Sequence, residues 1–115
     1  MANYLVLIYD SEAAWAAAGP DDVGRIHAAH EGFGKANAAS IRGGDALQPT
    51  STATSLRHEP SGELTVTDGA FAETKEALGG YYLIEATDLD EALAIARECP
   101  AAFGGVELRP VMTFD

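Results

Sequence analysis

Two histidines and an aspartate in the first half of the chain have the residue types needed for acid–base chemistry. His30 belongs to a stripe of five residues that recur at helical spacing and would face a core: Val23, Ile26, His30, Phe33 and Asn37. His27 lies on the flank of this stripe, one helical turn from Val23. An imidazole titrates near neutral pH and can therefore exchange protons with a substrate. We take His30 as the first candidate for a general acid or base and His27 as a neighbouring binding residue.

Asp45 follows the Gly43-Gly44 pair that comes after this predicted helix. A carboxylate bonded to an imidazole fixes the tautomer of the ring and raises its basicity, so we predict a His30–Asp45 pair, with Asp68 as a second candidate for the orienting carboxylate. The alternatives are a core histidine that is bonded to a strand carbonyl and an aspartate that is a solvated turn residue.

A second candidate region is the polar connector DGAFAETKE, residues 68–76. Asp68-Gly69 is a favourable turn pair. Phe71 is a possible anchor, and Glu73 and Lys75 would line a cleft above the sheet. The alternative is that the segment only positions the strand after it and closes a dimer. Residues 72–78 also have the helix propensity for one short turn that ends at Gly79.

Two further residues, Arg57 and Tyr81, complete the predicted site. Lys75 or Arg57 would hold a substrate anion. Tyr81 and Tyr82 would point to opposite faces of their strand, and we take Tyr81 as the one that offers its hydroxyl to a ligand. The alternative is that both rings belong to the core, with the hydroxyl groups at its edge.

The elements that must position these residues follow the order strand, helix, several strands, helix, strand. We expect strands over residues 3–9, 79–86 and 105–112, and a hairpin formed by residues 52–58 and 63–67. A short turn over 12–18 should precede a helix over 20–40. A second helix should begin at Asp88-x-x-Glu91, with an apolar stripe of Leu89, Ala92, Leu93 and Ala96. Gly43-Gly44 should interrupt the chain before a short extended piece over 45–49.

This order predicts a single α+β domain over residues 1–115: a ferredoxin-like sandwich whose antiparallel sheet has two helices on one face. Residues 5–9 and 81–84 are apolar on both faces of their strands. A strand needs this only when both faces of its sheet are covered, and two helices cover only one. We therefore expect a homodimer in which a second subunit covers the other face.

The composition excludes several classes of function. Eighteen acidic residues against seven scattered basic ones give a net charge of −11, which disfavours binding to nucleic acid or to a membrane surface. Cys99 is the only cysteine, no basic leader precedes the first strand, and no apolar run approaches about 20 residues. We expect a cytoplasmic protein. No metal-ligand spacing, phosphate loop or nucleophile elbow is present, so we expect neither a metal nor a cofactor.

Residues 68–76 and 78–84, DGAFAETKE and LGGYYLI, closely resemble the signature of the DGPF-domain proteins of the YCII-related superfamily. Residues 4–9, 47–49, 53–54, 88–92 and 106–111 are similar to further landmarks of that family, so the resemblance covers nearly the whole chain. Ala70 stands where the signature has proline, which leaves the connector less rigid.

The resemblance implies a ferredoxin-like dimer in which two sheets pack as a shared α/β barrel. It also implies a cleft with a catalytic His and Asp, which His27 or His30 and Asp45 would match. We therefore expect a small-molecule-binding enzyme with a His/Asp acid–base pair. Some relatives accompany alternative sigma factors, and this leaves open a non-catalytic module that docks on a regulatory protein.

Overall fold

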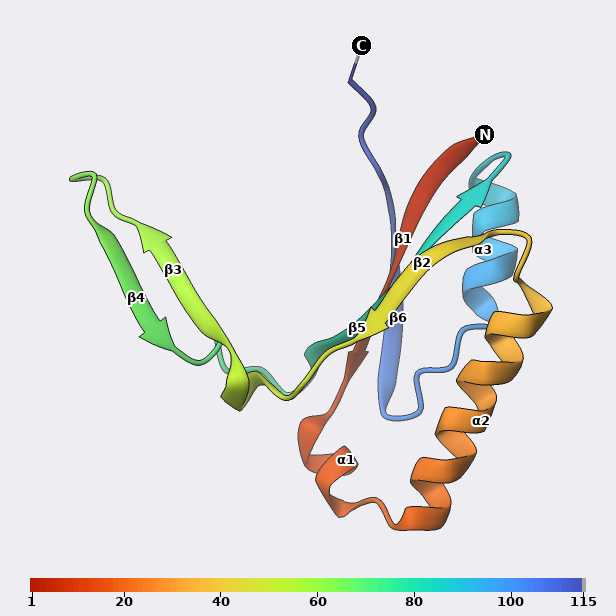
Figure 1. Ribbon diagram of the computed structural model, residues 1–115, viewed down its shortest axis with the longest axis horizontal. Coiled ribbons are helices and arrows are strands. Elements are labelled where there is room, and N and C mark those ends of the chain that lie inside the picture. The colour runs from red at the N-terminus through yellow and green to blue at the C-terminus, as the bar shows by residue number, and fades with distance from the viewer. Residues whose placement is uncertain (115) are drawn as a thin grey trace.

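The computed structural model describes residues 1–114, which form a four-stranded antiparallel sheet, helices and a separate two-stranded arm (Figure 1). The elements in chain order are β1 (Ala2–Asp10), α1 (Glu12–Ala17), α2 (Pro20–Ala36), β2 (Ile41–Ala46), the 3-10 turn η1 (Thr50–Thr52), β3 (Thr54–His58), β4 (Leu64–Asp68), β5 (Ala77–Ala86), α3 (Leu89–Arg97) and β6 (Gly104–Pro110). The sheet has the order β2-β5-β1-β6. This α+β architecture is consistent with the predicted ferredoxin-like fold.

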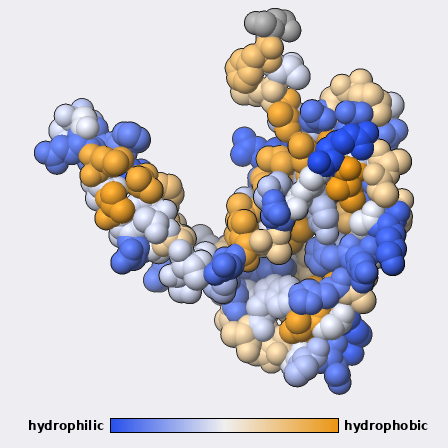
Figure 2. Space-filling model, viewed as in Figure 1, coloured by the Kyte–Doolittle hydropathy of each residue, from blue (hydrophilic) through white to orange (hydrophobic). Residues whose placement is uncertain are grey.

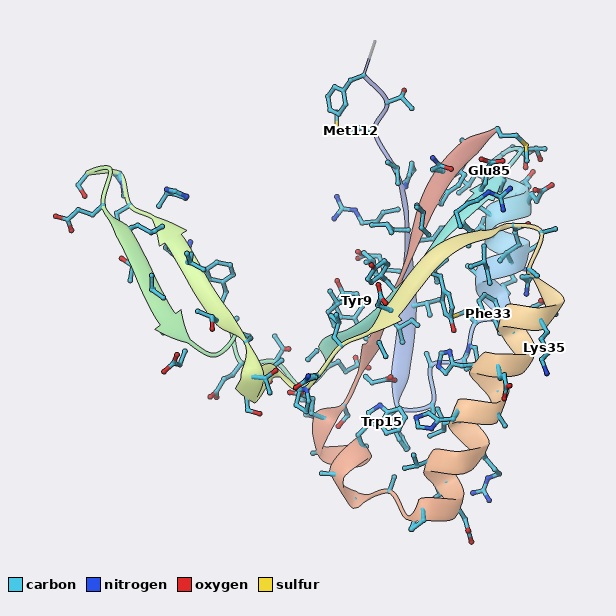
Figure 3. All side chains as sticks on the ribbon, viewed as in Figure 1. Tyr9, Trp15, Phe33, Lys35, Glu85 and Met112 are labelled. Carbon is cyan, nitrogen blue, oxygen red and sulfur yellow. The ribbon has the colours of Figure 1, made fainter. Side chains whose placement is uncertain are left out.

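Helices α2 and α3 lie on the same side of the sheet (Figure 1). The core between them is small: Val6 and Ile84 are fully buried in the two central strands, and Phe33 is the buried residue of α2. Figure 3 shows Phe33 directed from α2 towards the sheet. A core of this size supports one small domain with little reserve.

The opposite face of the sheet is apolar and has no helix on it. Along β1, Tyr4, Val6 and Ile8 are buried towards the helices, whereas the alternate residues Leu5 and Leu7 are half-buried on the other face. Leu5 pairs with Leu83 and Leu7 with Tyr81 of β5. We call Leu5, Leu7, Tyr9, Tyr81 and Leu83 the open sheet face. The two-sided apolar pattern read from the sequence therefore corresponds to a real uncovered surface.

The predicted stripe of α2 is confirmed, although the helix is shorter than predicted. Its five residues are the buried or half-buried positions of the stripe, whereas most other residues of α2 are exposed. The helix ends at Ala36 instead of Ser40 because Asn37 terminates it. The Asn37 side-chain amide donates to the Phe33 carbonyl at 3.1 Å and to the Glu98 carboxylate at 3.0 Å. This polar member of the stripe is thus satisfied at the end of the helix.

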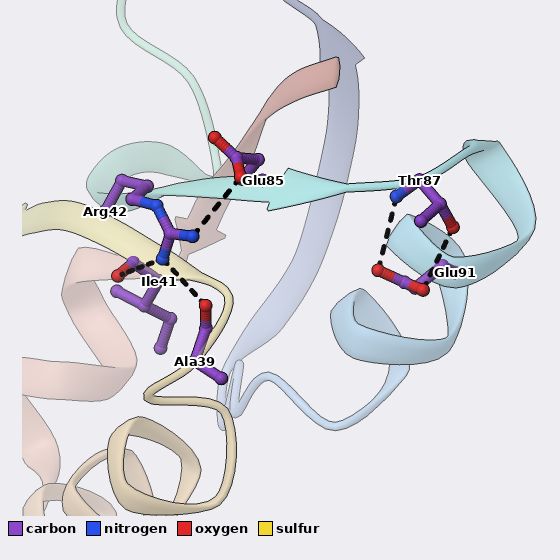
Figure 4. Close-up of polar contacts among 6 residues, drawn as sticks. All are labelled: Ala39, Ile41, Arg42, Glu85, Thr87 and Glu91. Carbon is purple, nitrogen blue, oxygen red and sulfur yellow. Dashed lines mark hydrogen bonds and ion pairs between the residues drawn. The ribbon is translucent and has the colours of Figure 1, made fainter. Parts of the chain in front are cut away.

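Helix α3 begins as predicted but buries a different stripe. The Asp88 carboxylate accepts a hydrogen bond from the Glu91 N–H at 2.9 Å, and the Glu91 carboxylate accepts from both the N–H and the hydroxyl of Thr87 (Figure 4). These bonds satisfy free donors at the start of the helix. The buried residues are Ala92, Ile95 and Ala96. The prediction that Leu89 and Leu93 face the core is wrong, since both are exposed.

Strand β2 also differs from the prediction. Gly43 and Gly44 do not interrupt the chain but lie inside the strand, which pairs with β5. A Cβ atom at Gly44 would lie 2.7 Å from the Tyr81 carbonyl oxygen, so this strand pairs closely only with glycine there. The guanidinium group of Arg42 donates to the Ala39 carbonyl and reaches the Glu85 carboxylate at 3.3 Å, which fixes the start of β2 (Figure 4).

The predicted hairpin is confirmed but does not join the main sheet. Strands β3 and β4 pair only with each other, from Thr54–Asp68 to His58–Leu64, and Gly62 makes the turn with a φ of +92°. The hairpin projects from the body as an arm (Figure 1). The connector over residues 69–76 contains bends and no helical turn, and β5 already begins at Ala77. No helix within residues 1–114 is long and apolar enough to cross a membrane.

Candidate functional site

A cleft of about 940 Å³ lies between the helical layer and the β2–β5 side of the sheet. Strand β1, helices α1 and α2, the 46–51 segment and the start of β5 all contribute to its wall. A volume of this size suits a small-molecule site. Its titratable and aromatic residues are three acids, two histidines and three large rings: Asp10, Glu12, Asp45, His27, His30, Trp15, Tyr81 and Tyr82.

His30 reaches the cleft from the half-buried stripe of α2. Its Nδ1 atom lies 2.8 Å from the Tyr82 hydroxyl, and the two rings are stacked with centroids 6.0 Å apart. Burial lowers the pKa of His30 from its usual value, the negative charge of Asp10 partly opposes this, and His27 adds to the lowering. The imidazole is therefore held mainly neutral near pH 7.

Tyr82 contacts His30 from the sheet side of the cleft. Its ring packs against Phe33 with centroids 4.9 Å apart, and burial raises the pKa of its hydroxyl, which stays protonated. Within residues 1–114 the hydrogen bond of the His30 ring is made at Nδ1, which leaves Nε2 for a ligand. The arrangement is a neutral imidazole oriented by a neutral phenol.

Asp10 is a site residue that the sequence analysis missed. It is buried at the end of β1, where its carboxylate accepts from the Trp15 indole N–H at 3.2 Å and from the Phe103 N–H at 3.1 Å. These bonds fix the indole in the wall of the cleft. The alternation of Tyr4, Val6 and Ile8 is the signal that locates Asp10, since a period of two puts it on the same buried face.

Asp45 lines the cleft but bonds to a different residue from the one predicted. Its carboxylate accepts from the Tyr81 hydroxyl at 2.8 Å, and this bond raises the pKa of Tyr81. In the described part of the chain, His30 bonds to Tyr82 and not to Asp45. The two polar pairs therefore lie on opposite faces of β5: His30–Tyr82 on the side of the helices, and Asp45–Tyr81 on the open sheet face.

Glu12 ties two sides of the cleft together. Its carboxylate accepts from the Thr50 N–H at 2.8 Å and from the Thr50 hydroxyl, and these bonds lower the pKa of Glu12. The contact joins α1 to η1 across 38 positions of sequence. His27 completes this region, with its ring 6.5 Å from that of Trp15.

The remaining predicted site residues lie on the arm and the connector. The guanidinium group of Arg57 stacks on the Phe71 ring at 4.6 Å, Asp68 ends β4, and Glu73 and Lys75 are exposed in the connector. None of these five residues is part of the cleft wall of a single chain, which is formed by other residues. Among the described residues the wall contains three carboxylates and neither lysine nor arginine. A cation that would hold a substrate anion is therefore not provided by this wall.

No group of three or more histidine, cysteine or acidic side chains within residues 1–114 is arranged to hold a metal ion. Cys99 is buried under the core, and burial raises the pKa of its thiol to about 11. A thiol with so high a pKa is a poor nucleophile at neutral pH. The chemistry available in the cleft is therefore that of imidazole, phenol and carboxylate groups.

Comparison with known proteins places this chain in a family. A family model described as "YCII-related domain" matches residues 2–115. The chain belongs to the YCII-related family. It is also 49% identical over 71 residues to a Rhizobium meliloti (strain 1021) protein named "Uncharacterized protein R00369". That match covers 59% of this chain and 56% of the relative, so it spans little more than half of the relative's length. The name of the relative assigns no activity.

Proposed function

We propose that this YCII-related protein binds a small molecule in the cleft and that His30 exchanges a proton with it. The observation that carries the proposal is the His30–Tyr82 pair, which holds a neutral imidazole in a cleft of about 940 Å³ with Nε2 available to a ligand. A neutral imidazole is the form that accepts a proton, and burial, which lowers the pKa of His30, favours that form.

Each neighbour of His30 has a distinct role in this proposal. Tyr82 positions the ring at Nδ1. In this proposal Nδ1–H donates to the Tyr82 hydroxyl oxygen, which leaves Nε2 unprotonated and able to accept the proton. Asp10 acts through space, because its negative charge favours the imidazolium that forms when His30 takes a proton. Asp45 orients Tyr81 on the open sheet face. In this proposal the His30–Asp45 pair predicted from the sequence is replaced by His30 supported by Asp10, and Asp45 has a separate role.

The charge of the wall defines the class of ligand. Asp10 and Glu12 of the wall carry negative charge, and among the described residues the wall has no basic side chain other than two histidines, so an anion would be repelled. Trp15 and Tyr82 offer aromatic surface. Aromatic faces attract flat or cationic groups. We therefore propose a neutral or amine-bearing aromatic or carbonyl compound, in place of the anionic substrate that Arg57 or Lys75 would have held.

We also infer that the protein is a homodimer of the dimeric α/β barrel type. Leu5, Leu7 and Leu83 on the open sheet face support this, because apolar strands without a covering layer require a partner surface. The similarity of residues 68–84 to the DGPF signature supports membership of that branch of the family. A single, buried cysteine supports a reducing compartment such as the cytoplasm.

A thermal-shift screen tests the function. Amines, neutral aromatic carbonyl compounds, carboxylates and divalent metals are added separately to wild type, His30→Gln and the control His58→Gln, which lies on the arm. A ligand at about 100 times its Kd stabilises the folded state by about 2.7 kcal/mol, which is readily detected. We expect hits among amines or neutral aromatics that stabilise wild type and His58→Gln but not His30→Gln.

The opposite pattern would overturn the proposal. Hits that stabilise His30→Gln as strongly as wild type would place the ligand away from His30, and hits confined to carboxylates would contradict the charge argument. An absence of any hit, together with specific binding of a sigma-factor-type regulator, would favour the alternative of a non-catalytic docking module.

A further inference from the structure

The arm formed by β3 and β4 has one apolar face that nothing in the described chain covers. Leu56 is directly opposite Val66, and Leu64 is opposite His58, so the three apolar side chains share one face of the hairpin. They are 50%, 60% and 49% exposed for Leu56, Val66 and Leu64. Figure 2 shows a group of apolar atoms on the arm, at the left of the view. Large apolar residues that share one face of a hairpin indicate that this face is buried against another surface.

A single chain does not provide a partner for this arm. Strands β3 and β4 form a sheet of their own, apart from the main sheet. A lone two-stranded hairpin is only marginally stable in water. The whole molecule is also far from compact: its radius of gyration is 16.3 Å and its extents are 48 × 47 × 18 Å. A compact chain of about 100 residues has a radius of gyration of about 13 Å.

The position of the arm indicates what covers it. It leaves the body between the end of β2 and the start of β5, at the β2 edge of the main sheet. From there it extends to the side of the sheet opposite α2 and α3 (Figure 1). That is the side of the open sheet face, on which Tyr9 is labelled in Figure 3. A molecule seated on the open sheet face therefore lies within reach of the arm.

We propose that the arm clasps a second copy of this chain. Leu56, Leu64 and Val66 of each copy then pack against the surface of the other copy. The inference rests on the homodimer proposed above and adds the arm to its interface. Every copy carries both an uncovered apolar sheet face and an uncovered apolar arm. In a two-fold symmetric dimer, the same contact covers the sheet faces and the arms of both copies. An unrelated partner would have to be complementary to two separate surfaces. Residues 50–51 and 77–79 line the cleft and lie next to the segments that join the arm to the body, so clasping the second copy also holds this part of the cleft wall.

The test compares charge placed on the two faces of the same strand. Val66→Lys puts a charge on the apolar face, and Thr65→Lys puts the same charge on the opposite face, where Thr65 pairs with Arg57. Wild type, both variants and their mixtures are studied by sedimentation velocity over the micromolar range, with circular dichroism to confirm folding. We expect a wild-type mass near twice 12.0 kDa. We expect the dimer Kd of Val66→Lys to rise about tenfold or more, and that of Thr65→Lys to change by less than about twofold.

Two results would overturn the inference in different ways. A Val66→Lys dimer as tight as wild type would show that the open sheet faces associate without the arms, so the homodimer would stand and the clasp would fail. A wild-type protein that is monomeric at high micromolar concentration would contradict both the homodimer and the clasp. The apolar face of the arm would then have to bind a different protein. Hydrogen exchange of wild type gives an independent readout: the amides of residues 54–58 and 64–68 should be more protected as concentration rises, and equal exchange at all concentrations contradicts the clasp.

Discussion

At the scale of single residues, the chemistry of the cleft depends on how its charges act on His30. The stripe on α2 made His30 predictable from sequence, because its period of 3 and 4 is a local property. Its partners come from distant strands, and helical spacing carries no information about them. The alternation of β1 places Asp10 on the buried face, but only the fold brings it near His30. Asp45 does not pair with His30: its hydrogen bond goes to Tyr81 because the register of β2 on β5 sets these two residues opposite each other.

The through-space role of Asp10 gives a titration prediction. Removal of its negative charge in Asp10→Asn should lower the pKa of His30 further, because the charge now opposes the effect of burial. Proton NMR of the imidazole as a function of pH measures this directly. Asp45→Asn is the matched control, since that carboxylate is bonded to Tyr81. A larger shift in Asp45→Asn than in Asp10→Asn would contradict the assignment of Asp10.

The lowered pKa of His30 also predicts how stability depends on pH. The unfolded chain binds the proton more readily than the folded protein, so the contribution of neutral His30 is complete above the usual pKa of about 6.5. It is lost as the pH falls through the lowered value. Thermal unfolding should therefore show that wild type loses more stability than His30→Gln between pH 7.5 and 5, with His58→Gln behaving as wild type. An equal loss in all three would contradict the burial of His30.

At the scale of elements, the helices and strands were largely predictable, and the errors have physical causes. The capping pair at Asp88 and Glu91 is a local signal and was read correctly. The sequence predicts Leu89 and Leu93 inward because they form an apolar stripe with Ala92 and Ala96, but alanines let α3 approach the sheet and leave the leucines outside. Gly43-Gly44 was read as a break because glycine is rare inside strands. The close approach of Gly44 to β5 is a property of pairing that a single sequence does not display.

Gly44 gives a stability prediction with an internal control. An added Cβ would lie 2.7 Å from the Tyr81 carbonyl oxygen, so Gly44→Ala must displace β2. We expect a loss of about 1–3 kcal/mol in the free energy of unfolding, measured by urea denaturation. Gly43→Ala has no atom within 4 Å of the new methyl group and should be close to neutral. Equal effects of the two substitutions would show that β2 is not paired as described.

At the scale of the whole molecule, the sequence predicted one α+β unit with an uncovered sheet face but not the position of the arm. Alternation in residues 54–58 and 64–68 indicates a hairpin, and the turn at Gly62 sets its register. Whether such a hairpin extends a sheet or stands apart depends on the path of the flanking segments, which local patterns do not specify. The flat shape and the separate arm are the observations on which the proposed association with a second chain rests.

The net charge predicts a salt dependence for that association. Two chains of charge −11 repel each other, and the interface residues on the sheet and arm are mainly apolar. Raising the ionic strength from about 0.01 M to about 0.15 M shortens the Debye length from about 30 Å to about 8 Å. The dimer Kd from sedimentation equilibrium should therefore fall as salt is added. A Kd that rises with salt would mean that ion pairs, and not apolar contacts, hold the two chains together.

The measurement that most directly tests the central claim is nitrogen NMR of the three histidine side chains of wild type during titration with an amine or neutral aromatic hit from the thermal-shift screen. The proposed site predicts that the Nε2 signal of His30 responds most strongly, that Nδ1 keeps the signature of its bond to Tyr82, and that His58 on the arm does not respond. A ligand that stabilises the protein and shifts His58 while both nitrogens of His30 stay unchanged would contradict a His30-centred cleft.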